Sequence, residues 1–221
     1  MKTVGVILAG CGFLDGAEIY ESVLTLLALD RAGVSYQCLA PDVPQMHVVN
    51  HMTGEAVNEK RSVLVEASRI ARGKIKLLDE SWISRLDGFI FPGGFGAAKN
   101  YCDYAVKGDD CTMLPLMESF FQKVVESRKP IGLMCIAPTV FARAFRGKSL
   151  HPTLTVGAES GAARSIEKFG GKHQVCAVTE VVVDCENRIV STPAYMYNAR
   201  ISDVAQGIDK LVVEFLALMG A

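Results

Sequence analysis

A cysteine stands where an apolar run ends and a helix is expected to begin. Ile131–Met134 reads as a buried strand, Cys135 follows directly, and Pro138 fits the first turn of a helix predicted over residues 136–145. This strand–turn–helix context is typical of a nucleophile elbow. The positive end of the helix would favour the thiolate and lower the pKa of the thiol. Cys135 is therefore a candidate nucleophile, and the alternative is an ordinary buried cysteine.

Two glycines follow another predicted strand. Gly88–Phe91 reads as a buried strand and leads into Gly93 and Gly94. Glycines at a strand end let the backbone approach a ligand, and their N–H groups can stabilise an oxyanion. The alternative is a tight turn that only needs a positive φ angle. No Gly-Lys-Ser/Thr follows, so nucleotide hydrolysis on a Walker-type loop is disfavoured.

Two glutamates begin the first predicted helix. Glu18 and Glu21 are three residues apart and share one face of a helix expected over residues 18–31, which is otherwise mostly apolar. Burial would raise the pKa of such a carboxyl group and suit it to proton transfer. The alternative is that these acids only stabilise the N-terminal turn of the helix. Both remain candidate catalytic bases.

Histidine and metal chemistry have little support in the sequence. The four histidines are His47, His51, His151 and His173, and none of them follows Cys135 or stands in a His-x-Glu context. His173 and Cys176 have ligand-like spacing, but no second pair completes a site. We therefore expect neither a metal nor a cofactor.

Charge and cysteine content exclude other classes of function. The net charge of -1 over 221 residues builds no basic stripe, so no nucleic-acid partner is expected. The apolar runs are too short to cross a bilayer, so no membrane partner is expected either. Seven cysteines without a C-x-x-C pair argue against a secreted disulfide scaffold and predict a cytosolic protein. A structural role is retained for Cys38, Cys102, Cys111 and Cys185.

The candidate residues need a scaffold of alternating strands and helices. Further strands are predicted at 4–9, 34–40, 153–156, 175–183 and 188–191, and further helices at 60–72, 113–128, 158–169 and 201–219. A small hairpin is expected over 46–57. This order predicts one α/β domain over residues 1–221, with a mostly parallel sheet covered on both faces. Such sheets bind ligands beyond the carboxyl ends of their strands, and here those ends fall after Ala9, Phe91 and Met134.

Five short motifs make the chain resemble the ThiJ/PfpI superfamily, which is related to class I glutamine amidotransferase domains. The resemblance is closer still to its ElbB-like group. The motifs lie at residues 5–12, 50–56, 92–100, 134–138 and 192–196, and the match runs essentially end to end. It implies a flavodoxin-like three-layer sandwich and a homodimer. Asn100 closes the third motif, and with Gly93, Gly94 and Ile136 it forms the candidate set for binding the oxyanion and the substrate.

The resemblance also implies an activity. In this superfamily the elbow cysteine contacts a glutamate from the helix after the first strand. Glu21 lies twelve residues before Gly33, as that glutamate does before its helix-ending glycine, which favours Glu21 over Glu18. ElbB-like proteins are described as cofactor-independent glyoxalases and as isoprenoid-biosynthesis proteins with an amidotransferase-like domain. The expected substrate is a small 2-oxoaldehyde such as methylglyoxal or glyoxal, captured by Cys135 as a hemithioacetal.

The sequence departs from the superfamily pattern after the cysteine. Many members place a histidine there, whereas this chain has Ile136. Two other functions therefore stay open. One is a redox-sensing or stress-protective protein with an oxidisable Cys135. The other is an amidotransferase-like binding module, although Ala137 replaces the second glycine of a Gly-x-Cys-x-Gly elbow.

Overall fold

A seven-stranded sheet forms the centre of the molecule. The computed structural model describes residues 2–220 and gives the strand order β10-β11-β7-β6-β1-β2-β5. The strands are β1 (Thr3–Ile7), β2 (Ser35–Ala40), β5 (Ile75–Leu77), β6 (Gly88–Phe91), β7 (Ile131–Met134), β10 (Val182–Asp184) and β11 (Ile189–Thr192). All neighbours pair parallel except β10, which runs antiparallel to β11. The expected mostly parallel sheet is confirmed.

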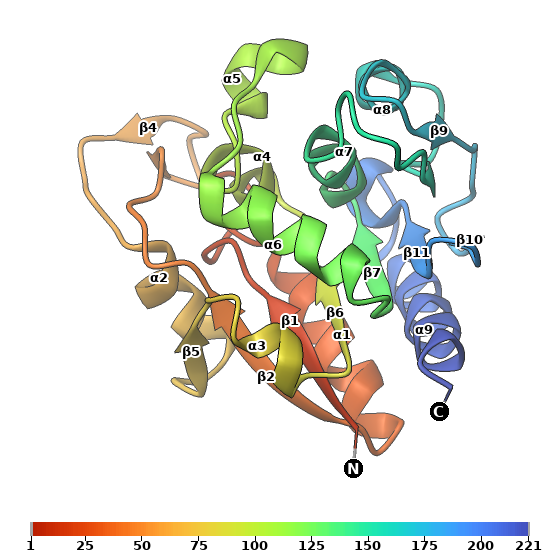
Figure 1. Ribbon diagram of the computed structural model, residues 1–221. Coiled ribbons are helices and arrows are strands. Elements are labelled where there is room, and N and C mark those ends of the chain that lie inside the picture. Colours follow the sequence, from red (N-terminus) through yellow and green to blue (C-terminus); the bar gives the residue numbers. More distant parts are fainter. Residues whose placement is uncertain (1, 221) are drawn as a thin grey trace.

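Helices cover both faces of this sheet. On one face lie α1 (Ile19–Arg31), α2 (Val63–Ile70) and α9 (Ile201–Leu218), and on the other α3 (Trp82–Arg85), α4 (Phe95–Asn100), α6 (Pro115–Glu126) and α7 (Ala137–Arg143). Figure 1 shows α6 in front of the strands and α1 and α9 behind them. Side chains alternate along β1 accordingly, because Val4 and Val6 enter the core under α1 and α9 whereas Ile7 enters the core under α6. The flavodoxin-like three-layer sandwich is confirmed.

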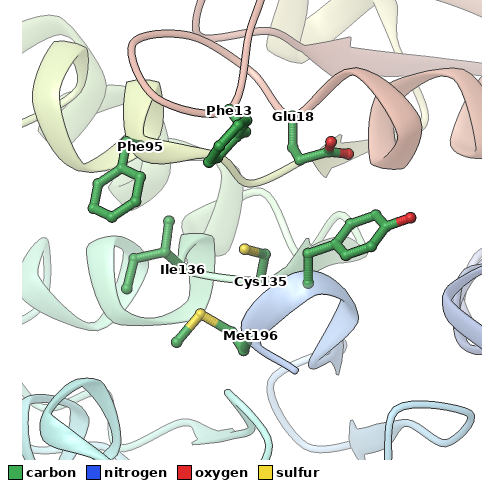
Figure 2. A pocket seen from close by; sticks show the side chains of 8 residues that line it. Phe13, Glu18, Phe95, Cys135, Ile136 and Met196 are labelled. Atoms are coloured by element: carbon green, nitrogen blue, oxygen red, sulfur yellow. The ribbon is translucent and has the colours of Figure 1, made fainter. Parts of the chain in front are cut away.

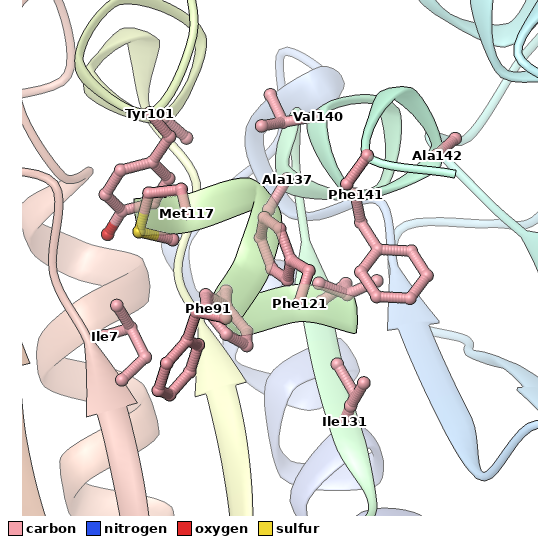
Figure 3. Close-up of a cluster of buried hydrophobic side chains, with 14 of the residues drawn as sticks. Ile7, Phe91, Tyr101, Met117, Phe121, Ile131, Ala137, Val140, Phe141 and Ala142 are labelled. Atoms are coloured by element: carbon pink, nitrogen blue, oxygen red, sulfur yellow. The ribbon is translucent and has the colours of Figure 1, made fainter. Parts of the chain in front are cut away.

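Aromatic rings pack the end of strand β6 against two helices near the site. Phe91 ends β6 and stacks on Phe121 of α6 with ring centroids 4.8 Å apart. Phe121 meets Phe141 of α7 edge to face at 5.3 Å (Figure 3). Such ring pairs add packing specificity to the burial of apolar area. They hold the end of β6 against α6 and α7, and α7 is the helix that follows the cysteine elbow.

Two small strand pairs lie outside the main sheet. β3 (Val48–Val49) and β4 (Ala56–Val57) form the predicted hairpin, which is tied down because Asp15 Oδ2 accepts a hydrogen bond from Val49 N at 2.7 Å. β8 (Thr153–Leu154) pairs parallel with β9 (Lys172–His173). The strand expected at 153–156 therefore belongs to this second pair and not to the central sheet.

Several short elements escaped the sequence patterns. These are β5, α3, α4, α5 (Tyr104–Lys107), η1 (Gly108–Asp110) and η2 (Ala194–Met196). Each has three to six residues, too few to show a period. The helix expected from residue 60 begins at Val63, because Ser62 caps it by accepting from Val65 N at 3.3 Å. Of the extended run expected at 175–183, only the C-terminal end belongs to a strand, β10. The helix expected at 158–169 is observed as α8 (Gly161–Lys168). Over residues 2–220, no helix combines the length and the apolar character that crossing a bilayer requires.

Candidate active site

Cys135 sits on a strained turn between β7 and α7. Its backbone N–H donates to Thr192 O of the neighbouring strand β11 at 3.1 Å, which holds the residue at the sheet edge. Its φ angle is 59°, a left-handed conformation that residues other than glycine rarely adopt. The helix then starts at Ala137, with Pro138 in its first turn as predicted. The thiol side chain lies beyond the carboxyl end of β7, with the residue 8% exposed.

Glu21 lies next to this thiol and is completely buried. Its carboxyl group lies against the thiol of Cys135, and each group shifts the pKa of the other. Its two oxygens also accept from Gly93 N at 2.8 Å and from Tyr195 N at 3.2 Å. Three segments far apart in the sequence therefore meet at one carboxyl group.

Glu18 has a different place from Glu21. It precedes α1 as the N-cap, and its Oε2 accepts from Glu21 N at 2.6 Å. Figure 2 shows its carboxylate turned away from the sulfur of Cys135. The structure thus gives Glu18 the helix-stabilising role that the sequence left open, and it gives Glu21 the contact with the thiol.

Burial controls the protonation of Glu21. Loss of solvent, and next the negative charge of Glu18, raise the pKa of the Glu21 carboxyl group to about 8. The hydrogen bonds from Gly93, Tyr195 and Cys135 lower the pKa but do not offset burial. Glu21 is therefore mostly protonated at neutral pH, and a small rise in pH converts it into a base.

The pKa of Cys135 departs from the expectation. Burial first, and the charge of Glu21 second, raise the pKa of the thiol well above its ordinary value. The N–H groups of Gly94 and Ile136 lower it, as the helix N-terminus was expected to do, but less strongly. The predicted lowering of the pKa is therefore wrong. The thiol needs a neighbouring base to give up its proton, and Glu21 is the carboxyl group in contact with it.

Gly93 and Gly94 must both be glycine. A Cβ atom on Gly93 would lie 2.4 Å from the Cβ of Cys135 and 2.9 Å from Oε2 of Glu21. Gly94 has a φ angle of 92°, and a Cβ there would lie 2.5 Å from Glu18 N. The turn thus needs glycine for its shape, and its N–H groups also reach Glu21 and Cys135. The interpretation as a tight turn therefore holds, and the oxyanion role stays a prediction.

A pocket of about 260 Å³ opens above the thiol. It is lined by Phe13, Glu18, Gly94, Phe95, Cys135, Ile136, Tyr195 and Met196. In Figure 2 the ring of Phe13 lies above the sulfur, Phe95 and Ile136 lie to its left, and Met196 lies below it. A small ligand at Cys135 would therefore be surrounded by aromatic and aliphatic side chains.

Four of these residues were missed by sequence reasoning. Tyr195 and Met196 belong to the motif at 192–196, which carried no assigned role. Phe13 and Phe95 each follow a glycine-rich turn at a strand end, the place where open α/β sheets bind ligands. That position was the available signal for both phenylalanines.

Asn100 is not part of the pocket lining. Its Nδ2 donates to Ala9 O at 2.8 Å and to Asp15 O at 3.0 Å, and its Oδ1 accepts from Met46 N at 3.0 Å. The side chain is buried and ties three loops together. Its predicted role in binding the substrate is therefore corrected to a role in shaping the loop that carries Phe13.

Ligands for a metal do not gather in the part of the chain that the structure describes. Over residues 2–220 no three side chains of histidine, cysteine, aspartate or glutamate come together in a metal-binding group. His51, which sequence reasoning set aside, packs edge to face on Phe13 at 5.4 Å between ring centroids. It therefore supports the pocket wall from behind.

A thiol on a strand–helix elbow above a flavodoxin-like sheet, with a glutamate against it, defines a DJ-1/ThiJ/PfpI-type protein. No family model matches the chain. It is 42% identical to the rat "ES1 protein homolog, mitochondrial" over 98% of this chain and 84% of that protein. It is also 42% identical to the human "glutamine amidotransferase-like class 1 domain-containing protein 3, mitochondrial", over 98% of this chain and 83% of that protein.

Solved structures agree with these relatives. An isoprenoid biosynthesis protein with an amidotransferase-like domain from Ehrlichia chaffeensis superposes with a TM-score of 0.90 and 36% identity, covering 97% of this chain and 99% of that chain. A DJ-1 superfamily protein from Salmonella typhimurium, at 17% identity and a TM-score of 0.57 over 100% of this chain and 89% of that one, shares the fold. The chain therefore belongs to the DJ-1/ThiJ/PfpI superfamily, in its group of ES1 and ElbB-like proteins.

The relatives correct one expectation. Cysteine usage predicted a cytosolic protein, but the rat and human relatives are both named as mitochondrial. The prediction is contradicted by these names. Free cysteines indicate a reducing compartment, and they carry no information on which one.

Proposed function

We propose that this protein is a cofactor-independent glyoxalase, which converts a 2-oxoaldehyde and water into a 2-hydroxy acid. One observation carries the proposal: the thiol of Cys135 lines an apolar pocket and lies against the fully buried carboxyl group of Glu21, whose pKa is about 8. The reaction needs a nucleophile for the aldehyde and a base that can move a proton between adjacent carbons. Membership of the superfamily supports this assignment.

The first step is capture of the aldehyde. Glu21, in its ionised form, takes the thiol proton while Cys135 Sγ forms a bond to the aldehyde carbon, C1. The electron pair of the C=O bond moves to oxygen, and the N–H groups of Gly94 and Ile136, which interact with the sulfur next to it, stabilise the negative charge. Glu21 returns the proton to this oxygen, and the product is a hemithioacetal.

The second step moves a proton along the substrate. Glu21 removes the proton from C1, and the resulting enediol is protonated at C2 by the same carboxyl group. The hydroxyl proton on C1 passes to the oxygen on C2, so C1 becomes the carbonyl carbon of a thioester. A carboxyl group with a pKa of about 8 suits this role, because it both accepts and donates a proton near neutral pH.

The last step releases the product. Water attacks the thioester carbon, the C–S bond breaks, and the sulfur recovers its proton. The acid leaves through the open side of the pocket. Glu18 lines that pocket, and its partly buried carboxyl group has a raised pKa for the same reason as Glu21, namely burial. Glu18 acts on the reaction through Glu21, because its carboxyl group accepts a hydrogen bond from the backbone N–H of Glu21.

The two alternatives are less well supported. Oxidation of Cys135 by peroxide requires an accessible thiolate, whereas this thiol is 8% exposed and burial raises its pKa. A glutaminase-like reaction requires a histidine at the cysteine, and none of the eight residues that line the pocket is a histidine. The glyoxalase reaction also uses the thiolate, but Glu21 can generate it beside the pocket, and no histidine is needed.

The test is formation of lactate from methylglyoxal in a buffer that contains EDTA. The wild-type protein should form lactate, and Cys135→Ala should show only the uncatalysed rate. Cys185→Ala is the matched control, because Cys185 is exposed and lies outside the pocket. Equal lactate formation by the wild-type protein and Cys135→Ala would remove the proposal.

A further inference from the structure

The pocket above Cys135 continues into a second hollow. The outer hollow has a volume of about 370 Å³ and is lined by Phe13, Glu18, Tyr20, Tyr195, Tyr197 and Asn198. Phe13, Glu18 and Tyr195 also line the inner pocket at the thiol. The two spaces therefore adjoin along these three side chains, and a ligand held at Cys135 can extend into the outer hollow.

Tyrosine rings form the walls of the outer hollow. Tyr20 of α1 and Tyr195 of η2 lie with their ring centroids 6.1 Å apart. The hydroxyl group of Tyr197 donates to Cys176 O at 3.0 Å, which fixes the orientation of that ring. Phe13 is held from behind by His51. The rings of Tyr197 and Phe13 are thus supported by neighbouring residues, and with Tyr20 and Tyr195 they offer an aromatic surface on which a flat apolar group can stack.

The charges around both spaces disfavour an anionic ligand. Among the eleven residues that line the two spaces, Glu18 is the carboxyl group and none is lysine, arginine or histidine. Lys99 lies close by, with its ammonium 5.5 Å from the ring centroid of Phe95, but it donates to Leu14 O and lines neither space. A carboxylate or phosphate on the substrate would lose water, gain no cationic partner and face Glu18.

We propose that the site takes uncharged 2-oxoaldehydes with an aromatic substituent, the aldehyde at Cys135 and the ring against the tyrosines of the outer hollow. This rests on the proposed glyoxalase function and goes further by naming the substrate class. Methylglyoxal is too short to reach the outer hollow. An aromatic ring on the same reactive group would displace water from it and gain apolar contact.

Turnover of three aldehydes tests the substrate class. We expect kcat/KM for phenylglyoxal to exceed that for methylglyoxal by roughly tenfold or more, because one ring is buried. We expect 4-carboxyphenylglyoxal, which has the same ring and one negative charge, to fall roughly tenfold or more below phenylglyoxal. Equal kcat/KM values for the neutral and the charged arylglyoxal would overturn the charge argument.

A pair of tyrosine variants locates the effect. Tyr20 lines the outer hollow and does not line the inner pocket, so Tyr20→Ala should lower the ratio of kcat/KM for phenylglyoxal to that for methylglyoxal several-fold. Tyr36→Ala is the matched control, since Tyr36 is also an exposed tyrosine and lines neither space. If both variants leave this ratio unchanged, the aromatic ring of the substrate binds outside the outer hollow and the proposal is wrong.

Alkylation of Cys135 tests the same selectivity without turnover. In 2-bromoacetophenone and in bromoacetone the sulfur bonds to the carbon that carries bromine, the C–Br bond breaks, and bromide and the thiol proton leave. Rates of Cys135 modification, mapped by mass spectrometry, are divided by the rates of the same reagents with glutathione. We expect the aryl reagent to be favoured by roughly tenfold or more, and its 4-carboxy derivative to lose that advantage.

The two readouts separate the two proposals. Selective alkylation without acid formation from any aldehyde would end the glyoxalase function and keep the ligand class. Acid formation from methylglyoxal with no aryl preference in either readout would end the ligand class and keep the glyoxalase function.

Discussion

The carboxyl group of Glu21 lies against the thiol of Cys135, and Glu21 has no surface exposed to solvent. Burial raises the pKa of both groups, so at neutral pH the pair is mostly uncharged. Two uncharged acids in contact are inert until one of them loses a proton. The reactivity of the site therefore depends on the loss of one proton shared by the pair.

Replacing Glu21 by glutamine should abolish most of the turnover. Glu21→Gln keeps the size of the side chain but cannot accept a proton, so we expect kcat to fall by on the order of 10²- to 10⁴-fold. KM should change far less, because the aldehyde is held by Cys135 and the backbone N–H groups. Steady-state kinetics on one aldehyde measure both constants.

Glu18→Gln is the matched control for that variant. It should be mild, because a glutamine oxygen can still accept the hydrogen bond from Glu21 N. The reverse pattern, with a large loss in Glu18→Gln and a small one in Glu21→Gln, would transfer the role of base to Glu18. Wild-type turnover in both variants would refute the proton transfer described above.

The buried Glu21 should make stability depend on pH. Its pKa rises from 4.5 to about 8 on folding, so the native state holds this proton more tightly than the unfolded chain does. The stability that results is fully present below about pH 4.5 and is lost as the pH rises through about 8. We expect the wild-type protein to lose on the order of a few kcal/mol relative to Glu21→Gln over this range.

Denaturant unfolding at several pH values measures this difference. The free energies of unfolding of the two proteins are subtracted, and the slope of this difference against pH is the informative quantity. The glutamine also changes the hydrogen bonds from Gly93 and Tyr195, but that change is the same at every pH and does not affect the slope. If the unfolding free energies of the wild type and Glu21→Gln change in parallel from about pH 5 to about pH 8, Glu21 is charged in the native state throughout.

Gly93→Ala should inactivate the protein. The added methyl group would lie 2.4 Å from the Cβ of Cys135, so the elbow or the Glu21 turn has to move. We expect a loss of activity of roughly 100-fold or more. Gly161→Ala is the control, because a Cβ there meets no atom closer than 4.0 Å and should leave activity unchanged. An active Gly93→Ala protein would mean that the close approach is not needed.

Asn100→Ala should lower stability more than it changes substrate binding. The change leaves Ala9 O, Asp15 O and Met46 N without the buried amide that they contact. Each unsatisfied group costs about 1–3 kcal/mol, so a clear fall in Tm is expected. In aldehyde kinetics well below that Tm, KM should stay within about threefold of wild type, since a change of 1.4 kcal/mol in binding is needed for tenfold. A large rise in KM without a change in Tm would restore the binding role.

We expect a homodimer that uses α1. Ile19, Val23 and Leu27 recur at helical spacing on that helix and are 40%, 47% and 38% exposed. Light scattering at micromolar concentration should give the dimer mass, and Val23→Glu should give the monomer mass. Val213→Glu on α9 is the control for an exposed valine elsewhere. A monomeric wild-type protein would remove the prediction.

The strands and long helices could be predicted because burial leaves a periodic pattern in them. β6 and β7 are fully buried and read as short apolar runs, and the turn after each one held glycine or cysteine. The three-layer arrangement then placed the ends of these strands at one edge of the sheet. For this reason Cys135, Gly93 and the two glutamates Glu18 and Glu21 could be assigned to one site before their contacts were known, and the family resemblance then favoured Glu21.

The protonation of the site could not be predicted in the same way. The helix N-terminus at Ile136 was visible in the sequence, but the degree of burial and the contact with Glu21 were not. These outweigh the helix and raise the pKa of Cys135. The lining of the outer hollow could not be predicted for a similar reason. Tyr195 reaches the pocket through η2, an element too short to show any periodicity.

The left-handed backbone of Cys135 bears on how such a protein can diverge. With a φ angle of 59°, glycine or asparagine would fit the turn with less strain than cysteine does. A descendant released from selection on the chemistry would gain stability by exchanging the cysteine for one of them. Without selection for activity, substitutions at this position therefore favour residues other than cysteine. A duplicate gene without the activity should lose its cysteine early. Sequencing of lineages with two copies would reveal which copy still depends on the thiol.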